Sequence, residues 1–499
     1  MLSYGKYYIT TPLYYVNASP HIGHSYTTIA ADVLARYMRQ YLGKEKVWFL
    51  TGTDEHGQKI QRAAEEQGLS PQDFSDKTAK IFKDLWQELG ISYDDFIRTT
   101  ESRHTKTVQR VLEILYKKGD IYSAQYEGWY CTPCETFWIE SQLVHQHCPD
   151  CDRKVERISE TNYFFKLSEY QGWLIQYLEE HPKFILPANR HEEVSRFLEL
   201  NPLIDLCISR PKERLNWGIP LPFSPDHVTY VWFDALINYI SAVGEFDAQG
   251  KYHSRWWPAQ MHLIGKDILR QHAVYWPIML QALGIDPPEH VLAHGWWMAG
   301  EDKMSKSRGN VISPLEMSRK FGVDAYRYFL LREVPFGLDG NFSEEAIIKR
   351  YNSDLANDLG NLVYRTLTMI EKYCQGNIPE EVENKNTQAK EVAIKIKQLS
   401  QNVAGYMMDV NFAAALEEIW ILINKANKYV EETKPWNLAK ENKTAELRAF
   451  LGLLVGVIRK VADEIAAFMP DAAESIKVQL GTTRVNKGSP LFPRIDKPV

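Results

Sequence analysis

The chain has 499 residues, enough for roughly two to four domains with well-filled hydrophobic cores. Hydrophobic residues make up 44% and charged residues 24% of the sequence, which is ordinary for a soluble protein, and no segment is of low complexity. The net charge of −6 does not by itself support nucleic-acid binding, so a nucleic-acid-binding protein of this composition must gather its Lys and Arg on one face.

Signals for secretion or membrane insertion are missing from the sequence. The longest apolar run, residues 449–458, is too short to span a bilayer. The first four residues lead directly into a strand pattern and not into a signal peptide. Four of the six cysteines are clustered, which does not resemble a secreted disulfide framework. These features predict a cytoplasmic protein in a reducing compartment.

The N-terminal residues predict a βαβ unit. Residues 7–10 are aromatic and β-branched, as in a buried strand. Apolar residues then recur every three or four positions over residues 26–41, which indicates a helix with one apolar face, and Gly43 is a suitable helix stop. Residues 47–51 form the next strand. A strand–helix–strand unit places parallel strands side by side, and its ligand site lies at their carboxyl ends and the helix N-terminus.

Two histidines stand at the start of that helix, in the tetrapeptide His21-Ile22-Gly23-His24. Exposed amides, the helix dipole and two imidazoles suit a triphosphate that gains charge as it reacts, and Gly23 lets a phosphate approach the backbone. A helix start that happens to carry two histidines explains the tetrapeptide equally well. A second motif is needed to decide between the two interpretations.

The chain continues with helices over residues 63–90, interrupted at Ser70-Pro71, and over residues 107–118. Residues 121–223 then differ in character, because they hold most of the cysteines and several short aromatic runs. We interpret this segment as an insertion between two halves of a nucleotide-binding domain.

The insertion contains two Cys-x-x-Cys turns. Two turns of this kind, each presenting two sulfurs, fit a tetrahedral thiolate site for one Zn²⁺. The expected ligands are Cys131, Cys134, Cys148 and Cys151. A disulfide pair is much less favoured in a cytoplasmic enzyme, and His145 or His147 could replace a sulfur. Because four cysteines fill the coordination shell, the zinc should be structural. Cys207 and Cys374 stand alone and are expected in the core.

A second set of parallel-sheet elements follows the insertion. Residues 261–266 are a predicted strand, residues 267–283 a helix, and residues 290–294 the last parallel strand. A Gly-rich turn then leads to the pentapeptide KMSKS at residues 303–307, and a further helix is predicted over residues 321–332. Two lysines in such a loop are most often only a solvated basic segment.

From Tyr351 onward the pattern is helical. In one segment the apolar residues alternate steps of four and three, as in the seam of a left-handed bundle helix. They are Leu447, Leu451, Leu454, Ile458, Val461, Ile465 and Phe468. An earlier helix is marked by Leu416, Ile419, Trp420, Ile423 and Val430. Periodicity alone predicts a helical bundle and does not indicate what the bundle does.

The order of the two motifs decides what the tetrapeptide leaves open. A HIGH tetrapeptide followed by KMSKS, each after a strand, is a very specific pair. The segments at residues 52–57, 231–239 and 264–268 accompany it. With these motifs the chain resembles the methionyl-tRNA synthetases, a family within the class I aminoacyl-tRNA synthetases.

The resemblance implies that L-methionine is activated with ATP to methionyl-adenylate and diphosphate, then transferred to the 3′ end of initiator and elongator tRNA(Met). It implies a Rossmann-like α/β catalytic domain with a parallel sheet, an inserted zinc-knuckle connective peptide, and an all-α anticodon-binding bundle. The expected bounds are 1–118 and 225–298 for the catalytic halves, 119–224 for the insertion, 299–350 for the KMSKS loop and stem-contact region, and 351–499 for the bundle. Mg²⁺ should accompany ATP. The C-terminal tRNA-binding, dimerising domain of many relatives is not seen, so a monomer is expected.

The resemblance also assigns the site residues. Catalysis is assigned to His21, His24, Lys303 and Lys306. ATP binding is assigned to His21, Gly23, His24, Gly265, Asp267 and Lys306. The methionine pocket is assigned to Leu13, Tyr15, Asp54, Trp232, Ala235, Leu236, Tyr239, Ile268 and His272, with Asp54 holding the ammonium. Anticodon reading is assigned to Asn361, Arg365 and Trp436. Leu236 and Gln271 stand where some relatives have Pro and Phe, which leaves the shape of the pocket wall open.

Three other interpretations share parts of this pattern. One is a class I synthetase for cysteine, valine or leucine, but cysteinyl enzymes use a catalytic-site zinc, whereas the cysteines here form one knuckle. Another is a tRNA-independent nucleotidyltransferase with a HIGH-like site, which would need no helical C-terminal third. The last is a catalytically inactive zinc-knuckle RNA-binding protein, in which intact HIGH and KMSKS motifs would be unexpected.

Overall fold

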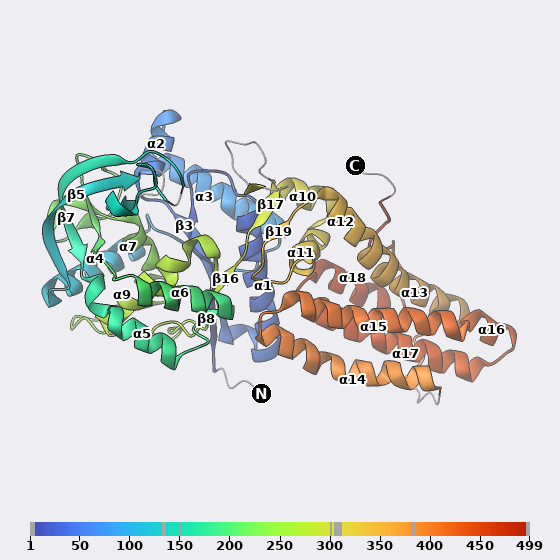
Figure 1. Cartoon of the computed structure of the whole chain (residues 1–499). Helices are drawn as coiled ribbons and strands as arrows, with labels where there is room; N and C mark the ends of the chain where they lie inside the picture. The colour runs from blue at the N-terminus through green and yellow to red at the C-terminus, as the bar shows by residue number, and fades with distance from the viewer. Residues whose placement is uncertain are drawn as a thin grey trace. The chain divides into compact units, whose positions relative to one another are not determined.

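The computed structural model describes residues 5–131, 136–138, 140–149, 151–299, 302–303, 312–380 and 386–495 (Figure 1). The chain forms two compact units. The first consists of Met1–Pro20, Met38–Gln87 and Ile91–His294, and the second of His21–Tyr37, Glu88–Gly90 and Gly295–Val499. Both units therefore combine segments that lie far apart in the sequence.

A parallel sheet forms the centre of the first unit. Its strand order is β2-β3-β1-β15-β16-β8, and β4 pairs with β3. The strands are β1 Tyr7–Thr10, β2 Tyr14–Tyr15, β3 Val47–Asp54, β4 Asp95–Arg98, β8 Ile185–Leu186, β15 Met261–Gly265 and β16 Val291–His294. All the pairings in this sheet are parallel, which confirms the expected parallel-sheet fold.

The central strands are short, apolar and covered on both faces. Every residue of β1 and of β16 is buried, as expected for parallel strands with helices on both sides. One hydrophobic core joins Tyr8 of β1 and Leu50 of β3 to Leu112 and Trp276 on the surrounding helices. The helices of this unit are α2 Gln58–Glu66, α3 Pro71–Glu88, α4 Ser102–Lys118, α5 Gln171–Glu180, α6 Ala188–Leu200, α7 Val231–Leu236, α8 Asn238–Ser241 and α9 Trp276–Leu283.

Local sequence signals set several of these helix ends. The Ser70 hydroxyl accepts a hydrogen bond of 3.1 Å from the Asp73 amide, and Pro71 is the first residue of α3, so the predicted break is confirmed. Helix α4 ends at Gly119, whose φ of 86° lies in the left-handed region that favours glycine.

The segment after β15 stays helical, as predicted, but it is not one regular α-helix. A 3₁₀ turn, η4 (Lys266–Ile268), leads into a π-helical turn, η5 (Gln271–Tyr275), and then into α9. Pro277 near the start of α9 has no N–H to donate to the preceding turn, which accounts for a change of helix type at this point.

The insertion carries an antiparallel sheet of its own, with strand order β6-β5-β7-β9. Its strands are β5 Ile121–Cys131, β6 Thr136–Trp138, β7 Glu156–Phe165 and β9 Leu206–Cys207. Two smaller sheets consist of β10 Ser209–Pro211, β11 Pro220–Leu221 and β12 Ser224–Thr229, and of β13 Gly244–Phe246 and β14 Tyr252–Ser254. The two-residue strand β8 also comes from the insertion, and its place in the central sheet was not predicted.

The described part of the second unit consists mainly of helices and also contains a small sheet. Strand β17 (Trp297–Ala299) pairs with β18 (Asp302–Lys303) and β19 (Gly340–Asn341). Helix α1, Ile22–Leu42, begins in this unit, extends beyond it and is followed by the 3₁₀ turn η1, Lys44–Lys46. The other helices of the unit are α10 Pro314–Phe321, α11 Val323–Arg332, α12 Glu344–Arg350, the π-helical η7 Tyr351–Gly360, α13 Asn361–Cys374, α14 Thr387–Met408, α15 Phe412–Thr433, α16 Pro435–Lys440, α17 Thr444–Ile465 and α18 Pro470–Leu480.

The predicted bundle seam is confirmed. All seven residues of the four-and-three pattern are buried, from Leu447 to Phe468, and so are the five that mark α15. Helices α14, α15 and α17 pack against one another and run side by side in Figure 1. No helix among the described residues is long and apolar enough to cross a membrane.

A buried arginine joins three parts of the second unit. The Arg327 side chain is fully buried and forms an ion pair of 2.7 Å with Asp32 of α1, which is also fully buried. The same guanidinium donates to the carbonyls of Ala467, at 3.1 Å, and Phe468, at 2.8 Å, just beyond α17. The burial of this charge is tolerable because each contact is a hydrogen bond to an acceptor that has also left water.

Candidate functional site

The two motif histidines lie together at the N-terminus of α1. Their rings stack with centroids 3.8 Å apart and an interplanar angle of 25°. The Gly23 amide donates to Nδ1 of His21 at 3.1 Å, and the His21 amide donates to Nδ1 of His24 at 3.2 Å. Because each Nδ1 accepts a hydrogen bond from a backbone amide, the neutral form of each ring carries its own proton on Nε2. The pair therefore presents N–H donors at a helix N-terminus, as a phosphate would require.

The KMSKS segment lies mostly outside the described residues, and this includes Lys306. Lys303 belongs to β18, where its backbone pairs with Met298. Immediately after the undescribed segment, the Ile312 carbonyl accepts a hydrogen bond of 3.2 Å from the Ile22 amide. Ile312, the first described residue after the KMSKS segment, thus lies against the first residue of α1, beside the histidine pair.

Asp54 lies at the carboxyl end of β3, where the sequence predicted a ligand site. It is the last residue of the strand, only 7% of it is exposed, and it pairs in register with Tyr15 of β2. Two residues earlier in β3, position 52 has room only for glycine, because a Cβ there would lie 2.0 Å from the Ile97 carbonyl oxygen and 2.9 Å from Leu13 Cδ2. Leu13 and Tyr15 therefore lie beside the carboxyl end of β3, where Asp54 ends the strand.

A second group of predicted pocket residues surrounds Tyr239. Its hydroxyl lies 2.7 Å from His272 Nε2, and His272 Nδ1 lies 2.9 Å from the Ile268 carbonyl. A carbonyl can only accept, so His272 Nδ1 carries the proton and Nε2 accepts from the Tyr239 hydroxyl. Burial lowers the pKa of His272 to about 4, so the ring is neutral near pH 7.

Helix α7 carries the remaining pocket residues. Ala235 and Leu236 are buried, whereas Trp232 is half-buried. The helix packs against η5, the π-helical turn that contains His272. Leu236 and Gln271, the two departures from some relatives, thus belong to two elements in contact.

Two other residues predicted to bind ATP lie at the end of β15 and just after it. Gly265 is the last residue of this strand, and a Cβ there would lie 2.7 Å from Asp267 Oδ1. The absence of a side chain at Gly265 therefore lets the Asp267 carboxylate fold back over the strand end. This arrangement lies in the first unit, whereas the histidine pair belongs to the second.

The structure reveals two buried acids next to Asp54 that sequence reasoning did not single out. Glu55 is fully buried and accepts hydrogen bonds of 2.6 and 2.8 Å from Arg98 and one of 2.6 Å from Thr100. Asp234, on α7, accepts from two histidine rings. The only sequence signal was their place inside the motif segments at residues 52–57 and 231–239.

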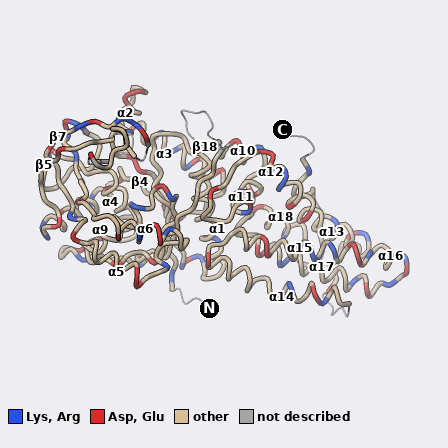
Figure 2. The backbone as a smooth tube through the Cα atoms, viewed as in Figure 1, with Lys and Arg blue, Asp and Glu red and all other residues tan. Residues whose placement is uncertain are grey.

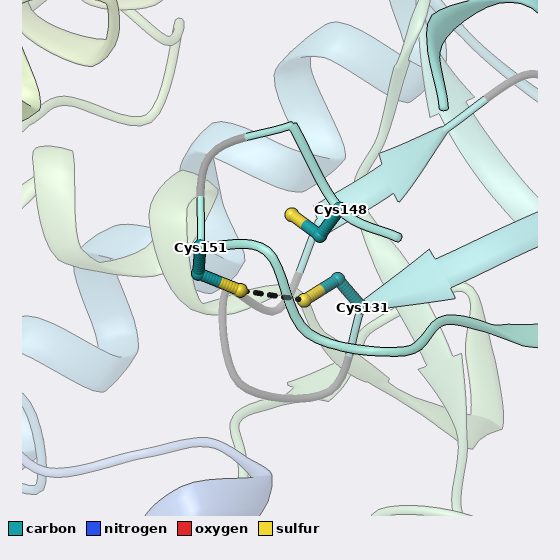
Figure 3. Close-up of side chains that lie close together, drawn as sticks. All are labelled: Cys131, Cys148 and Cys151. Atoms are coloured by element: carbon teal, nitrogen blue, oxygen red, sulfur yellow. Dashed lines mark hydrogen bonds between the residues drawn. The ribbon is translucent and has the colours of Figure 1, made fainter. Parts of the chain in front are cut away.

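Three of the four predicted metal ligands converge in the insertion. The Sγ atoms of Cys131, Cys148 and Cys151 all lie within 4.8 Å of one another, and those of Cys131 and Cys151 are 3.5 Å apart (Figure 3). Four sulfurs about 2.3 Å from a tetrahedral zinc would be separated by about 3.8 Å, so this spacing fits the ion. Cys134 lies outside the described residues.

A tight turn that contains His145 and His147 lies directly before Cys148. Val144 and His147 form a bridge across His145 and Gln146, which both have positive φ, as in a tight hairpin turn. The His147 ring lies 2.9 Å from the His145 carbonyl through Nδ1. Among the described residues, the cluster with metal-ligand spacing contains cysteines and neither of these histidines.

Of the predicted anticodon residues, Asn361 and Trp436 are exposed and Arg365 is half-buried. Asn361 and Arg365 are four residues apart on α13, so they share one face of the helix, and Asn361 is exposed. Trp436, the second residue of α16, is 41% exposed and is therefore not a core aromatic. Helix α13 carries two basic residues and one acidic residue, and α16 carries one lysine and no acidic residue (Figure 2).

Comparison with known proteins places the chain in a family. The model of the family described as tRNA synthetases class I (M) matches residues 7–159 and 153–367. The methionine–tRNA ligase of Caldanaerobacter subterraneus subsp. tengcongensis is 51% identical over 98% of this chain and 79% of its own length. The chain belongs to the methionine–tRNA ligases. The enzyme so named from Clostridium acetobutylicum is 49% identical over 98% of this chain and 78% of its own length.

Solved structures agree with this membership. Mycobacterium tuberculosis methionyl-tRNA synthetase in complex with methionyl-adenylate has a TM-score of 0.92 and 39% identity, and the match covers 98% of this chain and all of that one. The same protein in its apo form gives a TM-score of 0.86 with 36% identity over 99% of each chain. The likeness extends over the sheet, the insertion and the helical bundle, so the family expected from the motifs is confirmed.

Proposed function

We propose that this methionine–tRNA ligase activates L-methionine with ATP, releases diphosphate, and transfers the methionyl group to the 3′ end of initiator and elongator tRNA(Met). The likeness to ligases of this specificity over nearly the whole chain carries the proposal. The solved relative was captured with methionyl-adenylate, the product of the first half-reaction.

Adenylate formation requires the methionine carboxylate to attack the α-phosphorus of ATP, so the protein must position two anions and supply no covalent nucleophile. The stacked His21 and His24 rings, with their Nε2 protons at the α1 N-terminus, would donate to phosphate oxygens. Lys306, assisted by Lys303, would neutralise the β- and γ-phosphates, and Mg²⁺ would accompany ATP. The family resemblance also assigns Gly23, Gly265 and Asp267 to ATP binding.

The methionine site has two chemical ends. The buried Asp54 carboxylate would bind the ammonium, because a charge-assisted hydrogen bond is strong where water is excluded. Leu13, Tyr15, Trp232 and Tyr239 would surround the thioether, a polarizable group that packs well against aromatic rings. The remaining members of the site are Ala235, Leu236, Ile268 and His272.

The direct test is amino-acid-dependent exchange of pyrophosphate into ATP, run with each common amino acid and with homocysteine in turn. We expect exchange with methionine and weaker exchange with homocysteine, because one methylene is worth about 1–3 kcal/mol in such a pocket. The proposal would be contradicted if an amino acid other than methionine gave the fastest exchange, or if no amino acid supported exchange.

A pair of variants tests the ammonium anchor. Asp54→Asn should raise the KM for methionine about tenfold or more and leave the KM for ATP nearly unchanged, because one charge-assisted contact contributes about 1.5–3 kcal/mol. Asp84→Asn, at a largely exposed helix carboxylate of the same unit, is the matched control and should change neither value. Equal effects of Asp54→Asn on both substrates would count against the assignment.

The cysteine cluster supports one structural Zn²⁺, held by Cys131, Cys134, Cys148 and Cys151. Bound zinc would cross-link the two Cys-x-x-Cys turns of the insertion. The cysteines pack with Trp138 and Val155 in a small hydrophobic cluster. Metal analysis should find one zinc per chain, lost from a protein carrying Cys131→Ser and Cys148→Ser. Cys207→Ser, at a buried cysteine outside the cluster, should keep the metal. Zinc retained by the double variant would refute this site.

The helical bundle is proposed to read the CAU anticodon. Asn361 and Arg365 can hydrogen-bond base edges, and the exposed indole of Trp436 can stack on an unpaired base. With this assignment, residues 1–118 and 225–298 form the catalytic domain, 119–224 the connective peptide, and 351–499 the anticodon domain. The enzyme is further proposed to act as a cytoplasmic monomer.

A further inference from the structure

A buried carboxylate joins two histidines next to the proposed methionine site. Asp234 Oδ2 lies 2.7 Å from His56 Nδ1, and Asp234 Oδ1 lies 2.7 Å from His104 Nε2. The Asp234 and His104 side chains are fully buried, and only 7% of the His56 side chain is exposed. None of the three has a role in the chemistry described above.

The hydrogen bonds define which groups donate. The pKa of Asp234 lies below its ordinary value. Burial alone would raise this pKa, but the electrostatic attraction and hydrogen bonds of His56 and His104 lower it by more. The carboxylate therefore accepts from both rings. His104 Nδ1 lies 2.9 Å from the Ser241 hydroxyl, which donates to the Asn238 carbonyl at 3.2 Å. His104 is thus anchored at both ring nitrogens and holds the carboxylate from the side of α4.

The network joins two segments that carry different parts of the site. His56 lies two residues after Asp54, in the loop that leaves β3. Asp234 lies on α7, two residues after Trp232 and directly before Ala235. One carboxylate therefore sets the position of the loop bearing the proposed ammonium anchor relative to the helix bearing the proposed pocket wall.

The loop also has supports that do not involve Asp234, among them its contacts with Trp217 and a 2.9 Å hydrogen bond from the Glu55 amide to the Thr99 hydroxyl. The Trp217 indole N–H donates to the Glu55 carbonyl, the Gly57 amide donates to the Trp217 carbonyl at 3.2 Å, and the Trp217 ring lies edge-on to His56 at 5.4 Å. These contacts restrain the loop but do not reach α7. The direct link between the loop and α7 is the His56–Asp234 hydrogen bond.

We propose that His56, Asp234 and His104 act as positioning residues that fix the distance between the Asp54 loop and helix α7, and thereby set the affinity for methionine. The proposal rests on the methionine-activating function. It implies that losing the network loosens the fit to a small amino acid, while ATP, whose proposed contacts lie elsewhere, is bound as before.

The experiment compares two substitutions at His104, the member farthest along the network from Asp54. His104→Leu removes both ring hydrogen bonds while keeping an apolar side chain of similar bulk, whereas His104→Gln keeps an N–H donor for the carboxylate. In pyrophosphate exchange, His104→Leu should raise the KM for methionine about tenfold, with a much smaller effect on the KM for ATP. His104→Gln should recover most of the methionine affinity.

The control is His253→Leu, which breaks a 2.8 Å pair with Asp247 on the exposed surface of the same unit and should change neither KM. If His104→Leu is not obtained folded, His56→Leu and His56→Asn provide the same comparison, since the Asn amide mimics Nδ1. An unchanged KM for methionine in a folded variant would overturn the proposal. So would equal rises for methionine and ATP, which indicate a general loss of structure. Wild-type protein without methionine-dependent exchange would instead refute the proposed function.

Discussion

At position 23 the His21 ring occupies the space that a side chain would need. A Cβ at this position would lie 2.9 Å from His21 Cε1 and 3.1 Å from His21 Nδ1. The glycine thus allows the His21 ring to fold back over the first turn of α1 and to stack on His24. At this residue the requirement for glycine comes from the functional geometry, since α1 as a helix would gain stability from alanine.

Gly23→Ala should therefore separate activity from stability. We expect the kcat for pyrophosphate exchange to fall roughly ten- to a hundredfold, because the added methyl displaces the His21 ring. Thermal stability should not fall, since alanine favours a helix by about 1 kcal/mol. The matched control is Gly405→Ala in α14, where a Cβ meets nothing within 4 Å. Full activity in Gly23→Ala would show that the ring geometry is unimportant.

The buried histidines predict how stability depends on pH. The folded-state pKa of His272 is lowered by burial from 6.5 to about 4. Between these two values the unfolded chain binds a proton that the folded chain does not bind. Stability should therefore be complete above pH 6.5 and decline as the pH falls to 4, by about 3 kcal/mol from this residue.

The measurement is the free energy of unfolding across that pH range in wild type and His272→Gln. The glutamine can still accept from the Tyr239 hydroxyl but does not titrate, so its stability curve should be shallower. Some slope should remain, because burial also holds the pKa of His262 well below its usual value. Parallel curves for the two proteins would contradict the prediction.

Among the elements, α1 depends on a partner distant in sequence. Its Asp32 is fully buried and is held by Arg327 of α11, which also binds the carbonyls just after α17. The helix that begins with the histidine pair is thereby tied to the helical bundle by one guanidinium. Burying such a pair is costly, and removing Arg327 would leave the buried Asp32 carboxylate with Arg36 as its remaining ion-pair partner, at 2.7 Å.

Arg327→Met should cost about 3–5 kcal/mol of unfolding free energy, because a buried ion-pair partner is lost together with its carbonyl hydrogen bonds. Lys80→Met is the comparison, since Lys80 and Asp84 form a largely exposed pair worth less than about 1 kcal/mol. Denaturant unfolding of both variants gives the two values. Similar small losses would mean that Arg327 is not an essential link.

Sequence periodicity predicted α17, whose apolar residues recur on one face, and short aromatic and β-branched runs predicted the wholly or almost wholly buried strands around Ile9 and Phe49. Periodicity could not predict β8, because two residues, Ile185 and Leu186, show no period. It also could not reveal the Asp234 network, whose members come from three separate segments and meet only in the fold. The motif residues were predictable because their identities, and not their periodicity, indicate the chemistry.

For the molecule as a whole, the proposed methionine pocket and the proposed tRNA-reading residues belong to different structural units, whereas the histidine pair shares the second unit with the bundle. Asp54, Tyr239 and the cysteine cluster belong to the first unit, whereas the bundle with Trp436 belongs to the second. A change on the bundle surface should therefore affect the tRNA-dependent step alone, provided that the bundle remains folded.

Trp436→Ala should weaken tRNA charging by roughly ten- to a hundredfold and leave pyrophosphate exchange unchanged, because stacking on a base contributes about 1–3 kcal/mol. The matched control is Trp420→Ala, a buried bundle residue whose loss should lower the melting temperature instead. Both rates should be measured on the same preparation. If Trp436→Ala lowers both, the indole supports the fold; if it lowers neither, the anticodon is read elsewhere.

Strand β8 limits how this enzyme can be shortened. Ile185 and Leu186 pair with Val291 and Leu292, so a strand from the insertion covers the outer side of β16 in the central sheet. Excising the insertion to obtain a minimal ligase would uncover the hydrogen-bonding groups of a wholly buried, apolar strand, which invites aggregation through edge pairing. A viable deletion would have to retain these two residues or supply another cover, and the same restriction applies to natural loss of the segment during evolution.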